Sequence, residues 1–540
     1  MEIKGKAFSN IRDWFQIKEN RECLIKIVIA MLLPLVCSMI YCAFQGQSLG
    51  KVYLPGSEWN DELFYYKQVE AILKYGYPQG YFGFNESQAL KLSFAAWSPL
   101  LLFPWVLWGM LFGWTLFSPI ICNLVVASLS LAVFVLLTHL SWKKMSTLAV
   151  LFSLFTPFVR YLLSCTPEIL FFCLILLFYA IAYSEVQKSK VWKFVVLILM
   201  GILGTLMRPY LILLLLFPCF LWVKKSKWKG VAGSALVFGI ALLGYVAINH
   251  YFAAGYLTEL FFTDWIKVFF ERGILGGIRY DLSKLFYNLK LFCNYLVEGC
   301  RSGANPGAYF AGFMAVILML TWQSLCDLID WRKEVKSQNA VKTRALLGIE
   351  IHLLISCFGM LFMILMAYKI NEGSRHLLTF IVAGIFVILL MENKYFLKPV
   401  ILGILFFYLF VLMAKEPYDY QVPFVNEDRV AKIEKLQEIF CENMKVEKQN
   451  APSYDNVMIW VLRDNLENGK SVATAWQLLY AVPEGMGISC CESEYILAHS
   501  DQLKSKYLAS VRGGEIDHMI MQKGCSVLYQ DEDVVIYQLR

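Results

Sequence analysis

The sequence predicts a polytopic α-helical membrane protein that carries a small α/β domain at its C-terminal end. Of its 540 residues, 58% are apolar and only 17% are charged, whereas an ordinary soluble domain has about 25% charged residues. The apolar residues gather in runs of about 20, the length that a helix needs to cross a bilayer. The formal net charge of +7 does not indicate a nucleic-acid partner, because membrane proteins distribute Lys and Arg according to the side of the membrane.

About eleven membrane spans are expected, and residues 1–416 form the predicted membrane domain. The expected spans are residues 24–44, 118–138, 147–163, 168–184, 194–207, 209–222, 230–250, 307–326, 347–368, 377–391 and 398–414. The apolar segment 96–114 contains Pro99 and Pro104. We interpret it as a re-entrant or outer-leaflet segment that does not cross fully.

Basic residues in the short loops determine the predicted orientation. They are concentrated at the N-terminus, at Lys143 and Lys144, in the KKSKWK run from Lys224, and in residues 332–344. The positive-inside rule places such clusters in the cytoplasm, and they share one side only if segment 96–114 does not cross. A full crossing would put Lys143 and Lys144 outside. The protein is therefore expected in the plasma membrane, with its N-terminus cytoplasmic.

The same topology predicts which loops lie outside the membrane. A first external loop covers residues 45–95, and a long external loop covers residues 251–305. Residues 417–540 form an extracytoplasmic domain, in which NEDRVAKIEKLQEIF has the pattern of an amphipathic helix and NVMIWVL, CSVLYQ and DVVIYQL read as strands. This domain has no Gly-rich phosphate loop and no nucleophile elbow. We expect it to pack on the membrane domain or to cover it.

Acidic residues gather on the predicted external face. Asp61 and Glu62 lie in the first loop, and Glu168 follows Pro167 in the second external turn. A carboxylate at the membrane surface can act as a general base on an acceptor hydroxyl or can hold a divalent cation. The alternative is that these residues have no catalytic role and are ordinary acids in the first turn of a helix, where the helix dipole favours negative charge.

Arginines occur in later external turns. Arg208 stands in GTLMRPYLILLL, inside an apolar hairpin, and Arg375 and His376 stand in EGSRHLLTF. Arginine suits phosphate because its fork donates two hydrogen bonds and stays charged. Ionisable groups at this depth are costly and are often functional, although a side chain that extends to the interface is the alternative.

The order of these features along most of the chain resembles the order found in the GT-C superfamily of polytopic glycosyltransferases. The resemblance rests on NDELFYYKQVEAILKYGYP for the first-loop Asp-Glu motif, AWSPLLLFPWVLWGMLFGW for the segment after it, LLSCTPEILFF for the second external turn, and the two Arg-bearing turns. It implies a donor such as a dolichyl- or undecaprenyl-phosphate sugar, as used by mannosyl- and aminoarabinose-transferases of this type. Glu168 departs from the more usual Asp. The absence of a WWD-type signature argues against an oligosaccharyltransferase, and WSP replaces the KPP of lipid A aminosugar transferases.

The resemblance also implies roles for the site residues. Asp61 would be the catalytic base or a metal-linked carboxylate, with Glu62 as the second choice and Glu168 as the second acid. Arg208, Arg375 and His376 would bind the donor phosphate. A divalent metal ion held by Asp61 and Glu168 is a further option.

The expected function is inverting transfer of a hexosyl or pentosyl group from polyprenyl phosphate to a glycan, lipid or protein acceptor outside the cell. The alternatives are a lipid-linked glycan flippase or other transporter, and a non-catalytic assembly or receptor protein. A transporter needs charged residues along a path through the membrane, whereas the sequence places them at one face. Convergence of the acids and arginines in one site would favour the enzyme.

Overall fold

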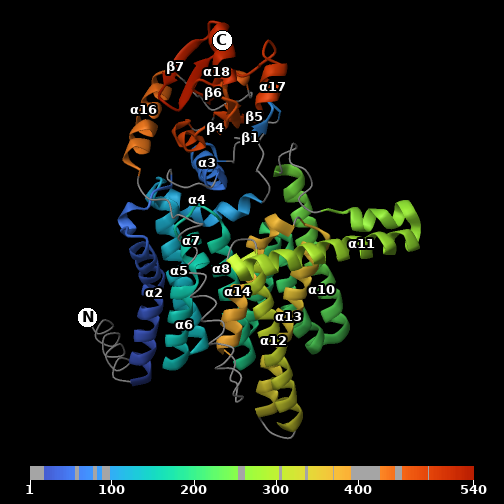
Figure 1. Ribbon diagram of the computed structural model, residues 1–540. Coiled ribbons are helices and arrows are strands. Elements are labelled where there is room, and N and C mark those ends of the chain that lie inside the picture. The colour runs from blue at the N-terminus through green and yellow to red at the C-terminus, as the bar shows by residue number, and fades with distance from the viewer. Residues whose placement is uncertain are drawn as a thin grey trace.

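The computed structural model describes residues 18–54, 60–76, 82–87, 98–252, 262–302, 307–334, 339–368, 370–390, 426–443, 453–483 and 486–540. The helices of the membrane domain form an elongated bundle, and the C-terminal domain stacks on one end of it (Figure 1). These helices are α2 (Lys18–Phe44), α3 (Asn60–Tyr75), α4 (Phe103–Phe112), α5 (Ser118–Thr138), α6 (Trp142–Leu154), α7 (Thr156–Leu162), α8 (Glu168–Gln187), α9 (Val191–Met207), α10 (Leu216–Phe252), α11 (Asp264–Ser302), α12 (Gly307–Glu334), α13 (Asn339–Met366) and α14 (Ile370–Leu390).

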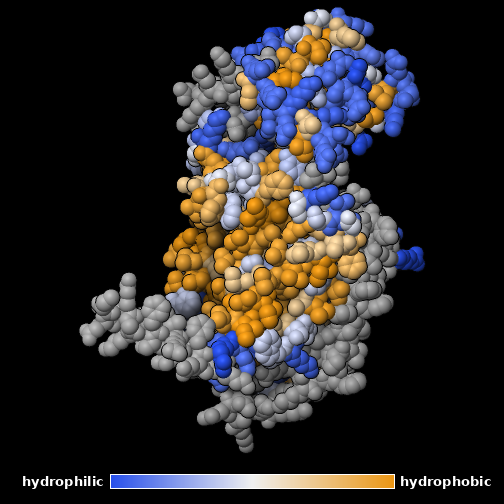
Figure 2. Space-filling model, turned by 90° about the vertical axis from the view of Figure 1, so that its left-hand side faces the viewer, coloured by the Kyte–Doolittle hydropathy of each residue, from blue (hydrophilic) through white to orange (hydrophobic). Residues whose placement is uncertain are grey.

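In the described part of the chain, six helices are long and apolar enough to cross a bilayer. They are Glu19–Phe44, Ser118–Thr138, Glu168–Gln187, Pro209–Phe252, Gly307–Ile329 and Leu346–Met366. The bent pair α6 and α7, with 70° between its helices, makes a seventh span if the two are counted together. The chain is therefore an integral membrane protein, and Figure 2 shows a broad apolar surface below the hydrophilic C-terminal domain.

The predicted number of about eleven spans is not confirmed. The spans expected at 209–222 and 230–250 belong to one stretch of 44 helical residues. This stretch breaks at Ser226 and Lys227, where the backbone is not helical. The spans expected at 194–207 and 377–391 correspond to the shorter apolar helices Val191–Met207 and Arg375–Leu390. The span expected at 398–414 lies outside the described residues.

The described part of segment 96–114, residues 98–114, contains a short 3-10 helix, η3 (Pro99–Leu102), followed by α4. The ten residues of α4 extend about 15 Å, which is half of the roughly 30 Å hydrocarbon core, so α4 by itself is too short to cross the membrane. It lies at the end of the bundle beside α3 (Figure 1). At the opposite end, Lys144 Nζ donates a hydrogen bond to the carbonyl oxygen of Leu390 at 2.8 Å. In Figure 1, α7 lies near the C-terminal domain and α6 runs away from it, so the basic turn that begins α6 lies at the opposite end of the bundle.

The C-terminal domain is built around a mixed six-stranded sheet of order β1-β5-β2-β6-β8-β7. Its strands are β2 (Val457–Val461), β5 (Gly487–Cys491), β6 (Tyr507–Val511), β7 (Ser526–Gln530), β8 (Val534–Gln538) and β1 (Phe82–Phe84). Strand β1 comes from residues 45–95, the loop that the sequence predicts to be external, and it pairs in parallel with β5. The loop thus supplies an edge strand, and the sheet is not made from residues 417–540 alone.

Further elements complete this domain around the sheet. They are the two-stranded β3 (Arg463–Asn465) and β4 (Ser471–Ala473), the helices α16 (Glu427–Asn443), α17 (Ser493–Ala498) and α18 (Glu515–Gln522), and the 3-10 helix η6 (Trp476–Ala481). The strands predicted from NVMIWVL, CSVLYQ and DVVIYQL are β2, β7 and β8. The predicted amphipathic helix is α16, in which Asn426 Oδ1 accepts from the Arg429 amide at 3.0 Å as an N-cap does.

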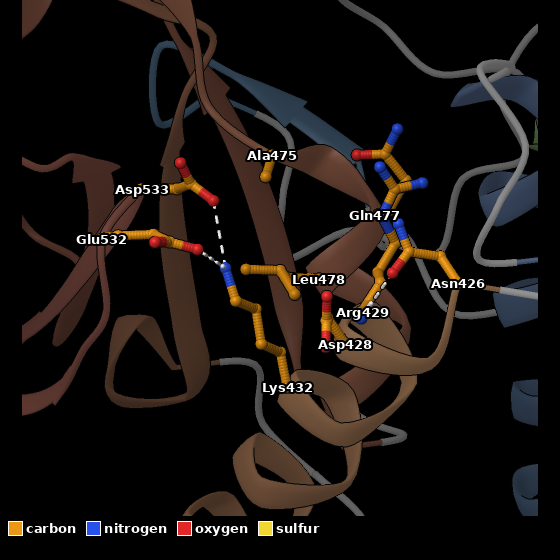
Figure 3. Close-up of a pocket in the computed structure, with 9 residues that line it drawn as sticks. All are labelled: Asn426, Asp428, Arg429, Lys432, Ala475, Gln477, Leu478, Glu532 and Asp533. Carbon is orange, nitrogen blue, oxygen red and sulfur yellow. Dashed lines mark hydrogen bonds and ion pairs between the residues drawn. The ribbon is translucent and has the colours of Figure 1, made fainter.

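A small polar cavity separates α16 from the turn between β7 and β8. Figure 3 shows Lys432 reaching across it to Glu532 at 3.3 Å and Asp533 at 3.0 Å. Gln477 and Leu478 of η6 also contribute to its lining. These exposed acids neutralise Lys432, so the contact attaches α16 to the sheet.

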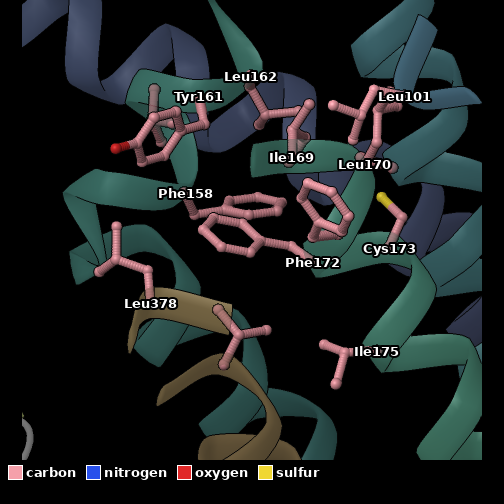
Figure 4. Packing of buried hydrophobic residues seen from close by; sticks show 14 of the residues in the cluster. Leu101, Phe158, Tyr161, Leu162, Ile169, Leu170, Phe172, Cys173, Ile175 and Leu378 are labelled. Atoms are coloured by element: carbon pink, nitrogen blue, oxygen red, sulfur yellow. The ribbon is translucent and has the colours of Figure 1, made fainter. Parts of the chain in front are cut away.

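The apolar core of the membrane domain supports the start of α8. Figure 4 shows Phe158 of α7 packed against Phe172 of α8, with Leu101 from η3 and Leu378 from α14 nearby. All four side chains are buried. Close-packed interiors resist displacement of their parts, so this packing fixes the position of Glu168 at the N-terminus of α8.

Lys67 joins α3 to the C-terminal domain. Its Nζ donates to the carbonyl oxygens of Tyr480 at 3.1 Å and Val482 at 2.8 Å, and it pairs with Glu70 at 2.8 Å. The residue is 2% exposed. The two carbonyls end η6, so one buried lysine fastens the C-terminal domain to the helix that carries Asp61.

Lys67→Met is expected to lower the apparent melting temperature in detergent and to speed proteolysis of the C-terminal domain. Methionine keeps the volume but leaves buried acceptors unsatisfied, at a cost of about 1–3 kcal/mol each. Lys74→Met, at an exposed position of the same helix, is the control and should change neither quantity. Equal behaviour of the two variants would contradict this docking role.

Candidate functional site

A buried ion pair lies at the end of the membrane domain that faces the C-terminal domain. Arg208 Nη2 donates to Glu168 Oε1 at 2.8 Å, and the two side chains are 0% and 1% exposed. Glu168 begins α8, and Arg208 occupies extended backbone between α9 and the 3-10 helix η4 (Pro209–Leu215). The residue before a proline favours this extended conformation. Burial removes both charged groups from water, so either one would carry a large desolvation cost if its partner were removed.

Three further side chains surround Arg208. Its Nη1 donates to His376 Nδ1 at 2.7 Å and to the Tyr210 hydroxyl at 3.1 Å. Its guanidinium lies 4.3 Å from the centre of the Phe171 ring, a cation–π distance. Because guanidinium only donates, His376 Nδ1 is the acceptor, which makes the imidazole neutral with its proton on Nε2. The shell therefore fixes Arg208 in one orientation.

A second ion pair leads from this buried pair toward solvent. Arg375 Nη1 donates to Asp61 Oδ2 at 2.8 Å, and the side chains are 34% and 38% exposed. Arg375 Nε also lies 3.8 Å from Glu168 Oε1. Asp61, Arg375, Glu168 and Arg208 thus alternate in sign from the partly exposed end to the interior. We call these four residues together with His376 the charge cluster.

Helix α3 presents two different faces to its surroundings. Asp61 and Tyr65 are four residues apart and share a face, and burial raises the pKa of Tyr65 close to the cluster, with the charge of Asp61 adding to the effect. Glu62 and Tyr66 share the next face. Glu62 is buried and its Oε1 accepts from the Cys165 amide at 3.2 Å, so it holds the turn before α8.

The same turn is held from the other side by Asn123 of α5. Its side-chain amide donates to the carbonyl oxygens of Leu162 at 3.2 Å and Ser164 at 2.7 Å. Its Oδ1 accepts from Trp105 of α4 at 2.8 Å. Asn123 thereby ties α4, α5 and the turn before Glu168 into one unit.

The structure brings together five of the six residues singled out from the sequence. Asp61, Glu168, Arg208, Arg375 and His376 form the charge cluster, whereas Glu62 lies beside it and bonds to backbone. Sequence reasoning gave Tyr210 and Phe171 no role at the site, and it left Tyr65 between a sugar-stacking residue and an interfacial aromatic. The spacing of Tyr65, four residues after Asp61 on a helix, was a usable signal, and so was the position of Tyr210 beside Arg208.

The donor set of the cluster does not suit a divalent metal ion. In the described residues, no group of three or more His, Cys, Asp or Glu side chains is placed to bind one. Asp61 and Glu168 already pair with Arg375 and Arg208, so the negative charge that a cation needs is neutralised. Two guanidinium groups would also repel it.

Comparisons with known proteins find similar solved structures but no similar sequence. No family model matches the sequence, and no curated protein matches it. The chain is similar to ArnT from Cupriavidus metallidurans in the apo state, with a TM-score of 0.41, 10% identity, and coverage of 95% of this chain and 98% of that one. ArnT from the same organism bound to undecaprenyl phosphate gives a TM-score of 0.40 with the same identity and coverage.

Proposed function

We propose that the protein is a GT-C-type glycosyltransferase that moves a sugar from a polyprenyl-phosphate donor to an acceptor hydroxyl. One observation carries the proposal: a partly exposed acid–arginine pair, Asp61 with Arg375, rests on a buried acid–arginine pair at one end of a membrane domain. A lipid-linked phosphate at this level could place its hydrocarbon chain among the helices and its headgroup at the cluster.

Arg375 is the group that suits the donor phosphate. It is the more exposed of the two arginines, and its guanidinium can exchange the Asp61 carboxylate for a phosphate oxygen. Such charge-assisted pairs are the strong class of hydrogen bond. When Arg375 binds phosphate, Asp61 is released from its partner and becomes available as a base. Donor binding would thus activate the base.

The proposed reaction is a single displacement with inversion. Asp61 takes the proton of the acceptor hydroxyl while the acceptor oxygen forms a bond to the anomeric carbon. The bond from that carbon to the phosphate oxygen breaks, and its electron pair leaves on the phosphate. Arg375 stabilises this charge, the kind of interaction that is worth about 10²–10³ in rate per lost donor.

The buried members of the cluster have positioning roles in this proposal. Glu168 and Arg208 are inaccessible to substrate, so we assign them to holding Arg375 in place, instead of acting as a second acid and a phosphate ligand. His376 orients Arg208 through Nδ1, and Glu62 holds the turn before α8. Because two arginines supply the positive charge of the cluster, the proposed reaction uses no metal ion.

We place the site on the extracytoplasmic side. The charge cluster lies at the end of the bundle next to the C-terminal domain, and the basic turn at Lys144 lies at the other end. The positive-inside rule assigns that basic end to the cytoplasm. Both the acceptor and the C-terminal domain would then be outside.

A donor panel tests the proposal. Purified protein in nanodiscs is given polyprenyl-phosphate sugars and a membrane extract as acceptor, with and without EDTA. We expect one donor to be consumed equally in both conditions, and Arg375→Ala to lower turnover about 10²–10³-fold.

The matched control is Arg332→Ala, at an exposed arginine on α12, which should retain full turnover. Consumption of no donor by folded protein would overturn the enzyme assignment and favour the transporter. Loss of activity in EDTA that Mg²⁺ or Mn²⁺ restores would overturn the metal-free mechanism.

A further inference from the structure

Helix α11 is a helical hairpin. Its backbone leaves the helical region at Gly273, where φ is 69°, a value that favours glycine. Asp264 in the first limb accepts hydrogen bonds from Tyr280 and from Lys284, at 2.8 Å for the lysine, in the second limb. In Figure 1 the first limb lies on the side of the C-terminal domain, and the second limb runs sideways across the bundle.

The second limb lies at the level where a membrane span ends. Asn288 Nδ2 donates to the carbonyl oxygen of Leu365 at 2.5 Å, and the Phe262 amide donates to that of Ala367 at 2.8 Å. Both acceptors are at the end of the span Leu346–Met366. The rings of Phe292 and Phe310 are 4.7 Å apart, which packs the limb against the first turn of α12. The limb is therefore at a membrane boundary.

One face of the second limb carries exposed apolar side chains. They lie within an arc of about 140°, and they recur every three or four residues when Cys293 is included. We call this set the apolar stripe: Ile274, Ile278, Leu282, Phe286, Leu289 and Val297, each 41% exposed or more. Cys293 is also exposed and falls on the same arc.

The apolar stripe points away from the C-terminal domain. Tyr280 and Lys284 hold the first limb on one side of the helix, and the middle of the stripe lies about 180° around the helix axis from them. Since the first limb is on the side of the C-terminal domain, the stripe faces the region beside the spans. That region is occupied by lipid in a membrane.

Basic residues border the apolar stripe. Arg279, Lys290 and Arg301 are exposed and follow the edge of the stripe over about 40° of the helix circumference. Long basic side chains at such an edge can keep their stems in apolar surroundings while their charges reach lipid phosphates. The pattern matches a helix that lies in the plane of the interface, with an apolar face and a basic border.

We propose that the second limb of α11 lies in the bilayer interface, with the apolar stripe among the acyl chains and the basic border at the lipid phosphates. This occupant follows from the level of the limb, the direction of the stripe and the charges beside it. The proposal is independent of the transferase assignment, because it concerns a surface outside the charge cluster.

Spin-label accessibility tests this placement. The label is attached to Cys293 in a variant in which Cys23, Cys300, Cys441, Cys490 and Cys525 are serine, and the protein is reconstituted in nanodiscs. Collisions with oxygen, which concentrates in the bilayer, are compared with collisions with a water-soluble nickel chelate. We expect oxygen to dominate several-fold at residue 293.

The matched control moves the label by one residue, to Asn294→Cys with Cys293→Ser. Asn294 is exposed on the polar side of the limb, so the nickel chelate should dominate there. Nickel access at residue 293 equal to that at residue 294 would overturn the proposal. Low access to both reagents, with dipolar broadening between labels, would overturn it in favour of a second copy of the chain.

Discussion

Asp61→Asn is expected to lower sugar transfer by about 10²–10⁴-fold, the usual contribution of a general base, while the protein stays folded. Asparagine has nearly the same shape, and its side-chain oxygen can still accept from Arg375, but it cannot take a proton from the acceptor. The site is partly exposed, so loss of the charge should disturb packing little. The measurement is single-turnover transfer at saturating donor, together with the apparent melting temperature.

Glu62→Gln is the matched comparison on the adjacent residue. Glu62 is buried and its Oε1 accepts from the Cys165 amide. The side-chain oxygen of Gln can accept the same bond, so this change should leave the fold and the rate of each folded molecule close to wild type. A large rate loss in Glu62→Gln with an intact fold, and none in Asp61→Asn, would mean that Glu62 is the base and Asp61 is not.

The spans illustrate what periodicity and composition can predict. The helices 118–138 and 168–187 agree with prediction because long apolar runs have only one stable form in a bilayer. The helices that bend or break were harder to predict. The bend between α6 and α7 and the break at Lys227 depend on packing and local backbone conformation, and neither changes the hydropathy of the run.

The charge cluster was predictable in its membership but not in its arrangement. Arg208 and Glu168 stood out because ionisable groups inside apolar runs are expensive. The sequence could not tell that they would neutralise each other, since the two residues are 40 positions apart in the chain. It ranked Asp61 above Glu62 but could not tell which of the two faces the arginines, because adjacent helical residues point in different directions and only the surroundings decide their contacts.

Strand β1 could not be predicted from the sequence because it is short and its partner is distant. Residues 82–84 are only three in number, too few for an alternating pattern to identify a strand. They become a strand because β5 offers an unpaired edge, and Glu86 next to them accepts from the Lys504 and Ser505 amides at 3.0 and 2.7 Å. The partner lies some 400 residues away, so no local signal records the pairing.

The pair Glu168 and Arg208 should show strong coupling in a double-mutant cycle. Removing one member of a buried ion pair typically costs about 3–5 kcal/mol, because the other charge stays buried without compensation. Arg208→Met and Glu168→Gln are therefore each expected to lower the apparent melting temperature in detergent markedly. The double variant should be more stable than the sum of the single effects predicts, since it leaves no uncompensated charge.

The two single variants should also differ from each other. Arg375 Nε lies 3.8 Å from Glu168, so in Arg208→Met a second guanidinium can move toward the remaining carboxylate. In Glu168→Gln, Arg208 keeps only neutral acceptors and should be the less stable case. Additive effects across the cycle would mean that the pair does not stabilise the fold. If the double variant folds but transfers sugar at the wild-type rate, then Arg375 does not need this pair to hold its position, and the positioning roles proposed for Glu168 and Arg208 are wrong.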